Sequence, residues 1–406
     1  MTFPNRTFRF LVVNPELPHF DRTSGGLRLF TFIELLREAG ASCDYLVSTP
    51  QAERQRIGET DYQRYRERLA SVGVRLLETS VGAALRANNY DVVLFEFFHV
   101  AQPFLKLVRI QQPRARIVVD SVDLSFLRWH AKADLSGRRE DRTHAEAIEA
   151  AELETYRSAD LVLTLTDDEA QELARRIPGL PTFNLPNIHS LNHRSVGEHP
   201  LPSLLFIGSF THEPNVDAVR WFGQEIWPLI RARHPTARWV IIGANAPPDI
   251  AGMTDEGIEF KGRVPDTSPY LDEAWISIAP LRFGAGMKGK VGEALAWGLP
   301  VVTTEFGAQG YGVQDRVSVV LGDSAEAFAE GVIWLLDDTA RRSQIGLAGQ
   351  NAIRERFSRQ AVAHAIPELL KKIDALPVRR REAWRHLQRA RLALQAFWEK
   401  HLAWRI

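Results

Sequence analysis

The chain has 406 residues, of which 45% are hydrophobic and 25% are charged, a composition that excludes a globally disordered protein. Fifty basic residues balance fifty acidic ones, so the bulk charge does not indicate a nucleic-acid partner. The single cysteine, Cys43, excludes an internal disulfide and any metal site built from several cysteines. The length predicts two or three domains.

The N-terminal twenty residues lack the long apolar run and the small-residue cleavage site of a signal peptide. No apolar run approaches about 18 residues, the length that crosses a bilayer as a helix. We therefore expect a cytoplasmic protein without a membrane-spanning helix.

Short apolar runs alternate with amphipathic stretches through the first half of the chain. Residues 8–13 (FRFLVV) are typical of a buried strand, and residues 26–39 have apolar side chains at helical spacing up to Gly40. Continuous apolar strands separated by helices indicate a parallel sheet that is covered on both faces. Residues 1–190 are therefore predicted to form one doubly wound α/β domain, with further strands at 44–47, 92–95, 117–119 and 161–165.

Residues 187–203 break this alternation, because they are polar, contain prolines and have no apolar period. We assign residues 191–203 to a linker. The alternation then restarts, which predicts a second α/β domain over residues 204–360. Its expected strands are 204–207, 239–242, 258–260, 276–279, 301–303 and 317–321, with helices that include 216–233 and 290–297.

The C-terminal part of the sequence is helical in pattern. Residues 361–376 are expected to form a helix that packs back toward the N-terminal domain. Residues 378–406 carry seven Arg and one Lys against two Glu, together with three Trp. A basic amphipathic helix with tryptophan is typical of a membrane-surface element or of a partner-docking helix. We expect the tail at 377–406 to contact an anionic membrane surface, at the inner face of the cell membrane, or a partner helix.

A glycine-rich loop lies between a predicted strand and a predicted helix, in the string APLRFGAGMKGKVGEALAWG (residues 279–298). A glycine loop that enters a helix offers free backbone N–H groups and the positive end of the helix dipole, which favours phosphate. Lys288 and Lys290 add positive charge at the same place. The pattern therefore predicts a site for a phosphorylated ligand.

Three other interpretations of this loop differ in how well they fit. Gly284, Gly289 and Lys290 match a P-loop, but Val291 replaces the Ser or Thr whose hydroxyl binds Mg²⁺. Gly284, Gly286 and Gly289 also match the dinucleotide fingerprint, with Glu305 downstream as the acid for a ribose. A lone G-x-G-x-x-G is a weak signal, and this one lies within the second domain. The glycines could also serve turn geometry alone.

The string PLRFGAGMKGKVGEALAWGLPVVTTEFGAQG resembles the donor-binding segment of retaining family-4 glycosyltransferases of the GT-B fold. Upstream, LLFIGSFTHEPNVDAVRWFGQEIWPLI resembles the start of their C-terminal domain. PELPHFDRTSGGLRLFTFIELLREAG and DSVDLSFLR resemble the N-terminal half of a bacterial subgroup that has a G-x-G-x-K-x-K donor loop. The resemblance covers residues 8–360 and implies two Rossmann-like domains that face a central cleft.

The resemblance implies that Glu293 holds the ribose hydroxyls of a nucleotide-sugar donor. The family places a second glutamate eight residues earlier, facing the donor sugar, and this sequence has Ala285 there. Backbone N–H groups would then take over part of that contact, from Gly284, Ala285, Gly286 and Met287.

Many family members carry an Arg and a Lys after the first strand of the C-terminal domain, to neutralise the diphosphate. Here the segment that begins at Gly208 and Ser209 reads GSFTHEPN and has neither. Lys288 is the first candidate to replace them and Arg282 the second. The segment FKGRVPD resembles the loop beside the nucleobase, which places Arg263 and Val264 in the donor site.

On the N-terminal side, the string DRTSGGLR again places glycines before a helix. The resemblance implies that this loop faces the diphosphate across the cleft. Gly25 and Gly26 would let the backbone approach phosphate closely, although Ser24 could simply cap the helix. Arg28, one turn into the helix, would reach the phosphate or the acceptor.

The acceptor side is less clear from the sequence. Related enzymes often place a histidine after the fourth strand, and this chain has Ser125 there, with His130 five residues further on. Asp120 and Asp123 are the nearest acids, and either could bind an acceptor hydroxyl. His99 is a further candidate. We assign catalytic roles to Lys288, Asp123 and His99.

The expected reaction needs no metal and no other cofactor, because no D-x-D triad occurs and cationic groups surround the loop. The resemblance implies retention of anomeric configuration, with the leaving phosphate accepting the acceptor's proton. The partners would be a nucleotide sugar and a glycan, lipid-linked or protein acceptor, in bacterial surface-glycan or polysaccharide synthesis. Two alternatives are an NAD(P)-dependent oxidoreductase and a non-catalytic nucleotide-sugar-binding module of a larger glycosyltransferase.

Overall fold

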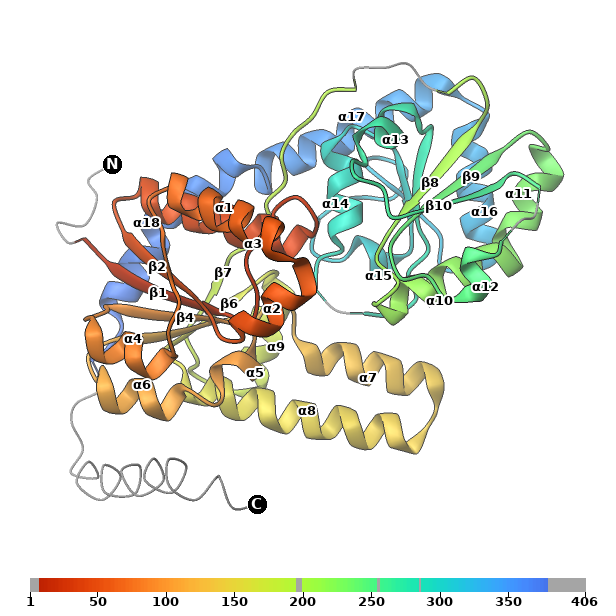
Figure 1. The fold of residues 1–406 in the computed structure, drawn as a ribbon. Helices are drawn as coiled ribbons and strands as arrows, with labels where there is room; N and C mark the ends of the chain where they lie inside the picture. The colour runs from red at the N-terminus through yellow and green to blue at the C-terminus, as the bar shows by residue number, and fades with distance from the viewer. Residues whose placement is uncertain (1–6, 195–198, 254–255, 285, 379–406) are drawn as a thin grey trace.

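Two parallel β-sheets, each in its own domain, organise the chain in the computed structural model (Figure 1). The structure describes residues 7–194, 199–253, 256–284 and 286–378. The predictions for Ala285 and for the tail at 379–406 lie outside the described residues.

The first sheet has seven strands in the order β3-β2-β1-β4-β5-β6-β7, and every pairing in it is parallel. Consecutive residues of a strand point to opposite faces: Val12 lies in the core on one face and Val13 in the core on the other. Both faces are therefore covered, as continuous apolar strands require. The strands are β1 (Arg9–Asn14), β2 (Ser42–Val47), β3 (Arg75–Leu77), β4 (Val92–Glu96), β5 (Arg116–Asp120), β6 (Leu161–Thr164) and β7 (Thr182–Asn184).

Helices separate these strands and supply the other half of each core. Helix α1 begins at Ser24, where the Thr23 side chain accepts a hydrogen bond from the Gly26 N–H. Helices α7 and α8 form a hairpin that projects from the domain (Figure 1). The helices are α1 (Ser24–Glu38), α2 (Pro50–Ile57), α3 (Glu59–Ser71), α4 (Val81–Ala87), α5 (Phe98–Ala101), α6 (Leu105–Gln111), α7 (Ser125–Ser136), α8 (Arg139–Ser158) and α9 (Asp167–Arg176).

The second sheet has six strands in the order β10-β9-β8-β11-β12-β13, with parallel pairing throughout. Strand order reverses after β10, so right-handed crossovers place the earlier and later helices on opposite faces. The strands are β8 (Ser203–Ile207), β9 (Arg238–Ile242), β10 (Ile258–Gly262), β11 (Ile276–Ala279), β12 (Val301–Thr303) and β13 (Val320–Leu321). The helices are α10 (Glu213–Trp221), the π-helical turn η1 (Phe222–Ile226), α11 (Trp227–Arg233), α12 (Pro248–Ala251), α13 (Ser268–Glu273), α14 (Gly289–Ala296), α15 (Glu305–Ala308), α16 (Ala325–Leu336) and α17 (Thr339–Arg356).

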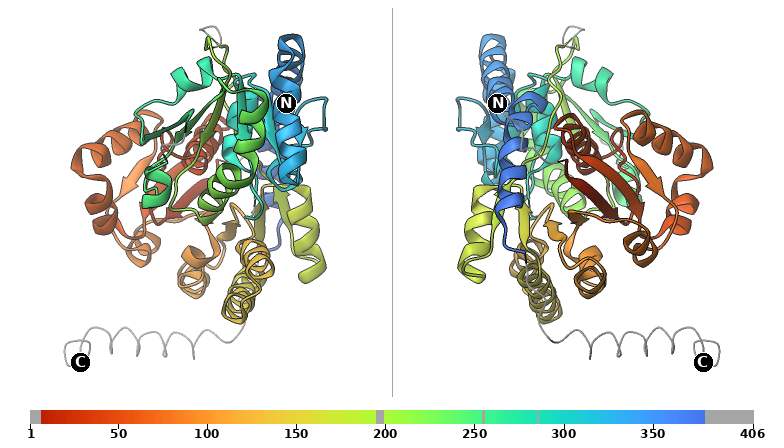
Figure 2. Two further views of the ribbon diagram at one scale, coloured as in Figure 1. Left: turned by 90° about the vertical axis from the view of Figure 1, so that its right-hand side faces the viewer. Right: turned by 90° about the vertical axis from the view of Figure 1, so that its left-hand side faces the viewer.

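The chain passes between the domains twice. The first crossing follows β7 and includes residues 185–194, and the second follows α17, where α18 (Arg359–Ala375) packs into the core of the first domain (Figure 2). The two crossings touch: the His189 N–H donates to the Phe357 carbonyl at 2.8 Å, and His189 pairs with Ser358 in an isolated bridge. The two segments that connect the domains therefore lie side by side.

The strands predicted at the centre of each sheet are confirmed, with ends shifted by a residue or two. The sequence missed β3 and β7, which lie at the two edges of the first sheet and have only three, partly exposed residues each. The strand expected at 317–321 is shorter. Arg316 has φ 53°, and the chain turns there before β13 begins at Val320.

No helix within the described ranges is long and apolar enough to cross a bilayer.

Candidate functional site

The loop between β11 and α14 is where the second domain meets the first. We call residues 284–290 the donor loop. A Cβ atom placed on Gly286 would lie 2.9 Å from the Asp123 Cβ, and one placed on Gly289 would lie 2.2 Å from the Ser24 Oγ. These contacts leave no room for a side chain at either glycine. The structure therefore brings the donor loop together with the start of α1 and the end of β5, three segments that the sequence singled out separately.

The site lies where strand order reverses in each sheet. In the second domain the reversal is between β8 and β11, and the residues after these strands are Gly208 and the donor loop. In the first domain it is between β1 and β4. Ligands of open α/β sheets bind beyond the carboxyl ends of the strands at such points. The boundary between the two domains at these reversals is the candidate binding site.

Lys288 occupies the N-cap position of α14, whose first turn has no side-chain cap. Its ammonium is nearly buried, donates to the Gly286 carbonyl at 2.6 Å, and lies 3.8 Å from the centre of the Phe306 ring. Burial lowers the pKa of Lys288 to about 8, and the nearby carboxylates of Glu169 and Asp123 oppose that shift. The uncapped helix N-terminus and this lysine form one electropositive corner.

Lys290 adds a second ammonium in the same corner, where the sequence predicted its positive charge without assigning it a donor-binding role. It donates to the Asn215 Oδ1, and its Nζ lies 4.7 Å from the centre of the Phe206 ring. A Cβ on Gly208 would lie 3.0 Å from this Nζ. Burial, and after it the positive charge of Lys288, lower the pKa of Lys290 to about 7. The K-x-K pattern of Lys288 and Lys290 is the sequence feature that indicates this second cation.

Asn215 holds the segment after β8 in place. Its amide donates to the Ser209 carbonyl at 2.6 Å while its oxygen accepts from Lys290. Gly208 is close-packed, since a Cβ there would lie 2.9 Å from the Asn215 side chain. The Ser209 hydroxyl is 2.9 Å from that of Thr211. The predicted residues Gly208 and Ser209 thus lie beside Lys290, at the end of β8.

Glu293 lies one turn into α14 and is partly exposed. Its carboxylate accepts a long hydrogen bond, 3.5 Å, from the Thr267 hydroxyl, and it forms no ion pair within the described part of the chain. Burial raises its pKa, and the Thr267 hydrogen bond opposes the rise. A carboxylate with one long hydrogen bond from the protein can still accept hydrogen bonds from a ligand.

The loop after β10 adjoins Glu293 through Thr267. The side chain of Val264 packs against the core of the second domain, whereas Arg263 is exposed. Thr267 is thus the residue of this loop that contacts Glu293, and the donor-site roles of Arg263 and Val264 stay predictions.

The first domain contributes two strained turns to the cleft. Phe97, after β4, has φ 70°, and Val122, after β5, has φ 60°. Positive φ is costly for bulky and β-branched residues, and such strain gathers at functional sites. Asp123 follows directly and pairs with Arg128 at 2.6 Å.

Two buried glutamates fix the turns on either side of Asp123. The carboxylate of Glu152, on α8, accepts from the Ser125 N–H at 3.1 Å and the Phe126 N–H at 2.9 Å, so it caps α7. Glu169 closes a capping box at the start of α9 and accepts from the Leu165 N–H at 2.8 Å. Burial raises the pKa of each to about 7. Their role in the cleft is to hold backbone.

His99 is exposed on α5 and stacks on Phe97 at 5.4 Å between ring centres. Desolvation lowers its pKa, and the nearby Arg128 guanidinium lowers it further. On the opposite domain, the pKa of His212 is lowered by desolvation and then by Arg128 and Lys290. His212 is the exposed N-cap residue of α10, and the sequence did not single it out. His130, by contrast, pairs with Glu149 at 2.6 Å.

The contacts of Arg28 contradict the prediction that it reaches the phosphate or the acceptor. Its side chain and that of Asp120 are both 0% exposed, and they form a two-fold ion pair with distances of 2.7 and 3.0 Å. The same guanidinium donates to the Leu185 carbonyl at 2.8 Å. All its donors face the protein interior, so Arg28 stabilises the first domain and does not reach a ligand. Both carboxylate oxygens of Asp120 pair with Arg28, so Asp120 does not bind an acceptor hydroxyl.

The contacts of Arg282 contradict the prediction that it is a candidate to neutralise the diphosphate. It is exposed and pairs with Asp217 of α10, the Nε donating to Oδ2 at 2.9 Å. Its guanidinium also lies 5.2 Å from the centre of the Trp221 ring. Arg282 is a surface ion pair rather than the second cation of the donor loop, and Lys290 takes that position.

The two glycines in the first turn of α1 differ in role. A Cβ on Gly26 would lie 2.6 Å from the His19 carbonyl oxygen, so its need for glycine comes from packing within the first domain. Its N–H is already bound by the Thr23 hydroxyl at 3.0 Å. Gly25 has no atom within 4 Å of such a Cβ, and its backbone is open to a ligand.

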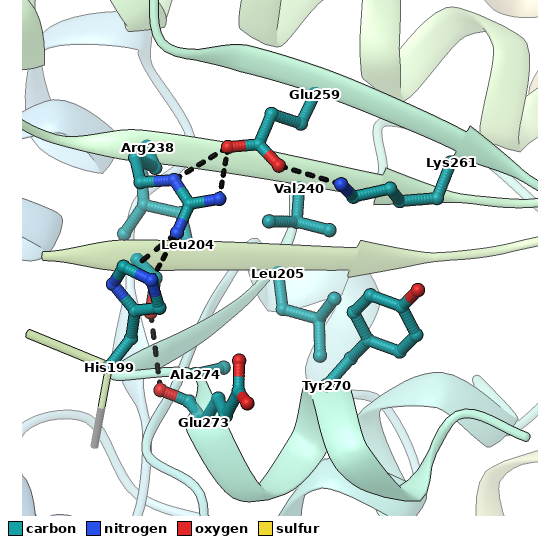
Figure 3. Close-up of a pocket in the computed structure, with 11 residues that line it drawn as sticks. His199, Leu204, Leu205, Arg238, Val240, Glu259, Lys261, Tyr270, Glu273 and Ala274 are labelled. Carbon is teal, nitrogen blue, oxygen red and sulfur yellow. Dashed lines mark hydrogen bonds and ion pairs between the residues drawn. The ribbon is translucent and has the colours of Figure 1, made fainter. Parts of the chain in front are cut away.

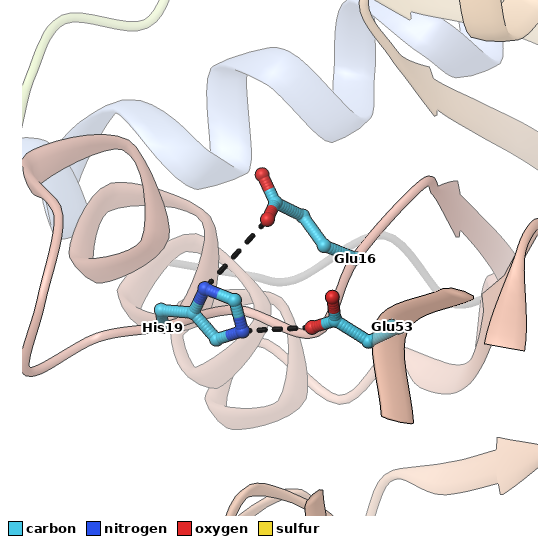
Figure 4. A group of neighbouring side chains, drawn as sticks. All are labelled: Glu16, His19 and Glu53. Atoms are coloured by element: carbon cyan, nitrogen blue, oxygen red, sulfur yellow. Dashed lines mark hydrogen bonds and ion pairs between the residues drawn. The ribbon is translucent and has the colours of Figure 1, made fainter. Parts of the chain in front are cut away.

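His19 itself belongs to a cluster with the buried Glu53 and the partly exposed Glu16 (Figure 4). Its Nε2 is 2.7 Å from the Glu53 Oε1, and Arg56 pairs with both acids. The Arg56 guanidinium supplies the positive charge that a cation would supply there. The cluster supports the entry to α1, since the His19 carbonyl accepts from the N–H groups of Arg22 and Thr23.

A separate cavity of about 140 Å³ lies between α13 and the face of β8, β9 and β10 (Figure 3). Its charged side chains satisfy one another: Arg238 donates to Glu259 at 2.6 Å, and Lys261 pairs with Glu259 at 2.8 Å. Ser203 and Arg238, the first residues of β8 and β9, line it. It therefore opens at the other end of the strands from the donor loop.

The α7–α8 hairpin lies below α10 in the view of Figure 1. Lys132 on α7 pairs with Glu213 at the start of α10 at 2.6 Å, so an ion pair joins the domains here. Lys132 also lies 4.8 Å from the centre of the Trp129 ring.

Comparison with known proteins agrees with this geometry. Residues 201–338 match the family described as Glycosyl transferases group 1. Sucrose-phosphate synthase from Thermosynechococcus elongatus superposes with a TM-score of 0.65 at 16% identity, covering 92% of this chain and 100% of that one. The HepE protein of Anabaena, in complex with UDP, gives 0.64 at 14% identity over 89% and 99%. The architecture is the GT-B fold.

An uncharacterised 44.6 kDa protein in the cps region of Klebsiella pneumoniae is 22% identical over 389 residues, covering 88% of this chain and 98% of that protein. Together with the match of residues 201–338 and the fold, this supports a GT-B glycosyltransferase. The fold class predicted from the sequence is thereby confirmed.

Proposed function

We propose that the protein is a retaining, metal-independent glycosyltransferase that moves a sugar from a nucleoside-diphosphate sugar to an acceptor hydroxyl. The observation that carries this proposal is the packing of the donor loop against the first domain, with two lysines and an uncapped helix N-terminus beside it. This arrangement supports a diphosphate site on the boundary between the two domains, where an acceptor held by the first domain can meet it.

Each part of the donor has a matching group. The diphosphate binds the N–H groups at the start of α14 together with Lys288 and Lys290, and Gly25 approaches it from the first domain. Glu293 accepts hydrogen bonds from the ribose hydroxyls, and the backbone around Val264 borders the base. Structures of Anabaena HepE in complex with UDP and with UDP-glucose support a uridine nucleotide.

The reaction breaks the bond between the anomeric carbon and the diphosphate oxygen and forms a bond from that carbon to the acceptor oxygen. Negative charge grows on the leaving diphosphate, and the two ammonium groups and the α14 dipole stabilise it. The leaving phosphate takes the acceptor's proton on the same face, which retains the configuration. Asp123 and His99 orient the acceptor hydroxyl from the first domain.

These positive groups supply the charge that a divalent cation supplies in other transferases. The reaction therefore proceeds in the presence of a chelator.

The acceptor is a glycan, a lipid-linked sugar or a protein, in surface-glycan or polysaccharide synthesis. The relative in the cps region supports this context. A cytoplasmic location at the inner face of the membrane, through the basic tail at 377–406, remains a prediction.

Thermal unfolding with UDP, GDP, dTDP, their sugars, NAD and NADP tests the proposal. A ligand at 100 times its Kd stabilises a protein by about 2.7 kcal/mol, which gives a clear shift in Tm. We expect one nucleoside diphosphate to shift the wild type and Glu330→Ala, an exposed control on α16, but not Glu293→Ala. NMR of the product with a chelator present then gives the anomeric configuration.

Other outcomes would count against the proposal in different ways. A shift with NAD alone would replace it with an oxidoreductase. Nucleotide-sugar binding without turnover on any acceptor or water would leave a non-catalytic binding module. An inverted product would refute retention, and loss of turnover on chelation would refute metal independence.

A further inference from the structure

We propose that Asn187, His189 and Tyr311 are positioning residues that hold the backbone of the donor loop in the orientation that binds phosphate. We call these three side chains the carbonyl clamp. The inference rests on the proposed function and adds residues that the sequence did not single out. All three side chains are at most 5% exposed and lie beside the connection between the domains.

Asn187 belongs to the first crossing between the domains. Its Nδ2 donates to the Met287 carbonyl at 3.2 Å, a bond between residues 100 positions apart in the sequence. An asparagine this deeply buried needs a partner, and a loop carbonyl of the other domain provides it. The connection therefore grips the donor loop directly.

Tyr311 and His189 grip the next carbonyl. The Tyr311 hydroxyl donates to the Lys288 carbonyl at 3.1 Å, and the His189 Nε2 lies 3.3 Å from the same hydroxyl oxygen. Because the tyrosine proton goes to Lys288, its oxygen accepts from the His189 Nε2–H. Burial lowers the pKa of His189 to about 4, so the imidazole is neutral at neutral pH and one tautomer completes the chain.

The orientation of these two carbonyls determines where two N–H groups point, and the Lys288 carbonyl also accepts from the Val291 N–H of α14 at 2.8 Å. In a planar trans peptide the C=O and the N–H of the next residue point in opposite directions. Fixing the Met287 carbonyl therefore orients the Lys288 N–H, and fixing the Lys288 carbonyl orients the Gly289 N–H. Both N–H groups then point away from the clamp, at the helix N-terminus where the proposal places the diphosphate.

The clamp also fits tightly against α14. A Cβ on Gly292 would lie 2.2 Å from the His189 Nε2 and 2.4 Å from the Tyr311 hydroxyl oxygen. Glycine at this position lets the clamp reach the backbone of the helix. The His189 backbone is in turn tied to Phe357 at the second crossing. Domain connection, clamp and donor loop thus form one continuous set of hydrogen bonds.

The test compares Tyr311→Phe and Asn187→Ala with Tyr90→Phe. Tyr90 is a matched control, because it is also buried and its hydroxyl also donates one hydrogen bond, to Asp44 at 2.8 Å, in the first domain at the start of β4. For each variant we would measure Tm, and the Kd of the nucleoside diphosphate that stabilises the wild type most. We would also measure hydrogen exchange of the peptide that contains residues 284–292, without ligand.

We expect all three variants to lower Tm. Only Tyr311→Phe and Asn187→Ala should raise the nucleotide Kd, by about 5- to 30-fold for one lost positioning hydrogen bond, and only they should speed exchange in the donor loop. Gly292→Ala, which pushes the clamp aside without removing a polar group, should do the same.

A lower Tm with unchanged Kd and unchanged exchange would show that the side chains serve stability alone and would overturn the inference. If the wild type binds no nucleotide, the proposed function fails. In that case unchanged exchange in the donor loop still refutes the clamp, and faster exchange still supports it.

Discussion

Replacing Gly289 with alanine tests the contact between the domains at its tightest point. The new methyl carbon would lie 2.2 Å from the Ser24 Oγ and 2.5 Å from the Ser24 Cβ. Rotation of the serine side chain moves the hydroxyl away, but the Ser24 Cβ cannot rotate out of the contact. The two domains must therefore move apart.

The required displacement follows from these distances. Ordinary van der Waals contact begins near 3.4 Å, so the methyl and the Ser24 Cβ must separate by at least 0.9 Å. A displacement of about 1 Å between reacting groups costs about 100-fold in rate. We expect kcat/KM of Gly289→Ala to fall by about that factor. Its Tm should change little, because opening the cleft relieves the clash without unfolding either domain.

The design includes a rescue. Ser24→Gly removes both clashing atoms, after which the nearest atom to the alanine methyl is the Cα of residue 24, at 4.0 Å. The helix cap is kept, since Thr23 supplies it. Gly289→Ala combined with Ser24→Gly should regain most of the lost activity, a coupling that a double-mutant cycle measures. Gly82→Ala is the control, because a methyl there meets its nearest atoms at 3.4 Å.

Steady-state transfer with saturating acceptor gives kcat/KM for the four variants and the wild type. Wild-type activity in Gly289→Ala would show that the domains do not approach this closely during the reaction. Loss of activity without rescue by Ser24→Gly would show that the methyl blocks the donor itself, and would refute the role assigned to the domain contact.

Two further predictions concern charge. Because the pKa values of Lys288 and Lys290 are lowered to about 8 and about 7, each lysine loses its charge as the pH rises through its pKa. The affinity for a nucleoside diphosphate should be highest below pH 7 and should fall by up to about tenfold per pH unit for each lysine. Calorimetry from pH 6 to 9 checks this, and Lys290→Arg, which stays charged, should flatten the curve; a flat curve for the wild type would contradict it. Arg28→Met should destabilise the first domain by about 3–5 kcal/mol, because it leaves the Asp120 carboxylate buried and unpaired. Urea unfolding measures this loss, and an unchanged nucleotide Kd in the folded variant would separate it from a direct role in the donor site.

Local patterns identified most of the architecture. Central strands such as residues 8–13 and 276–279 are continuous apolar runs, because a parallel sheet buried on both faces needs apolar side chains on both. The edge strands β3 and β7 were missed since their partly exposed residues do not need this pattern. The helix predicted at 216–233 contains the π-helical turn η1, and apolar spacing does not report that irregularity.

The donor loop was identified because its glycines and lysines are adjacent in the chain. Arg28 and Arg282 were misassigned for the opposite reason. Arg28 pairs with Asp120, 92 positions away, and Arg282 pairs with Asp217, 65 positions away. The local sequence around an arginine near a glycine motif does not show whether its side chain faces a ligand or an acid that is distant in the chain.

The sequence by itself determined the two sheets, the connection between them and the chemistry of the donor loop, since each depends on residues that are close in the chain. The tertiary structure decided which arginines pair with acids and how Asn187 and Tyr311 reach the loop. These depend on side chains that are distant in the sequence and meet only when each domain folds or, for Asn187, when the connection between the domains packs against the donor loop. Hydrogen bonds and close contacts are made over a few ångströms, and sequence separation carries no information about which distant groups come that close.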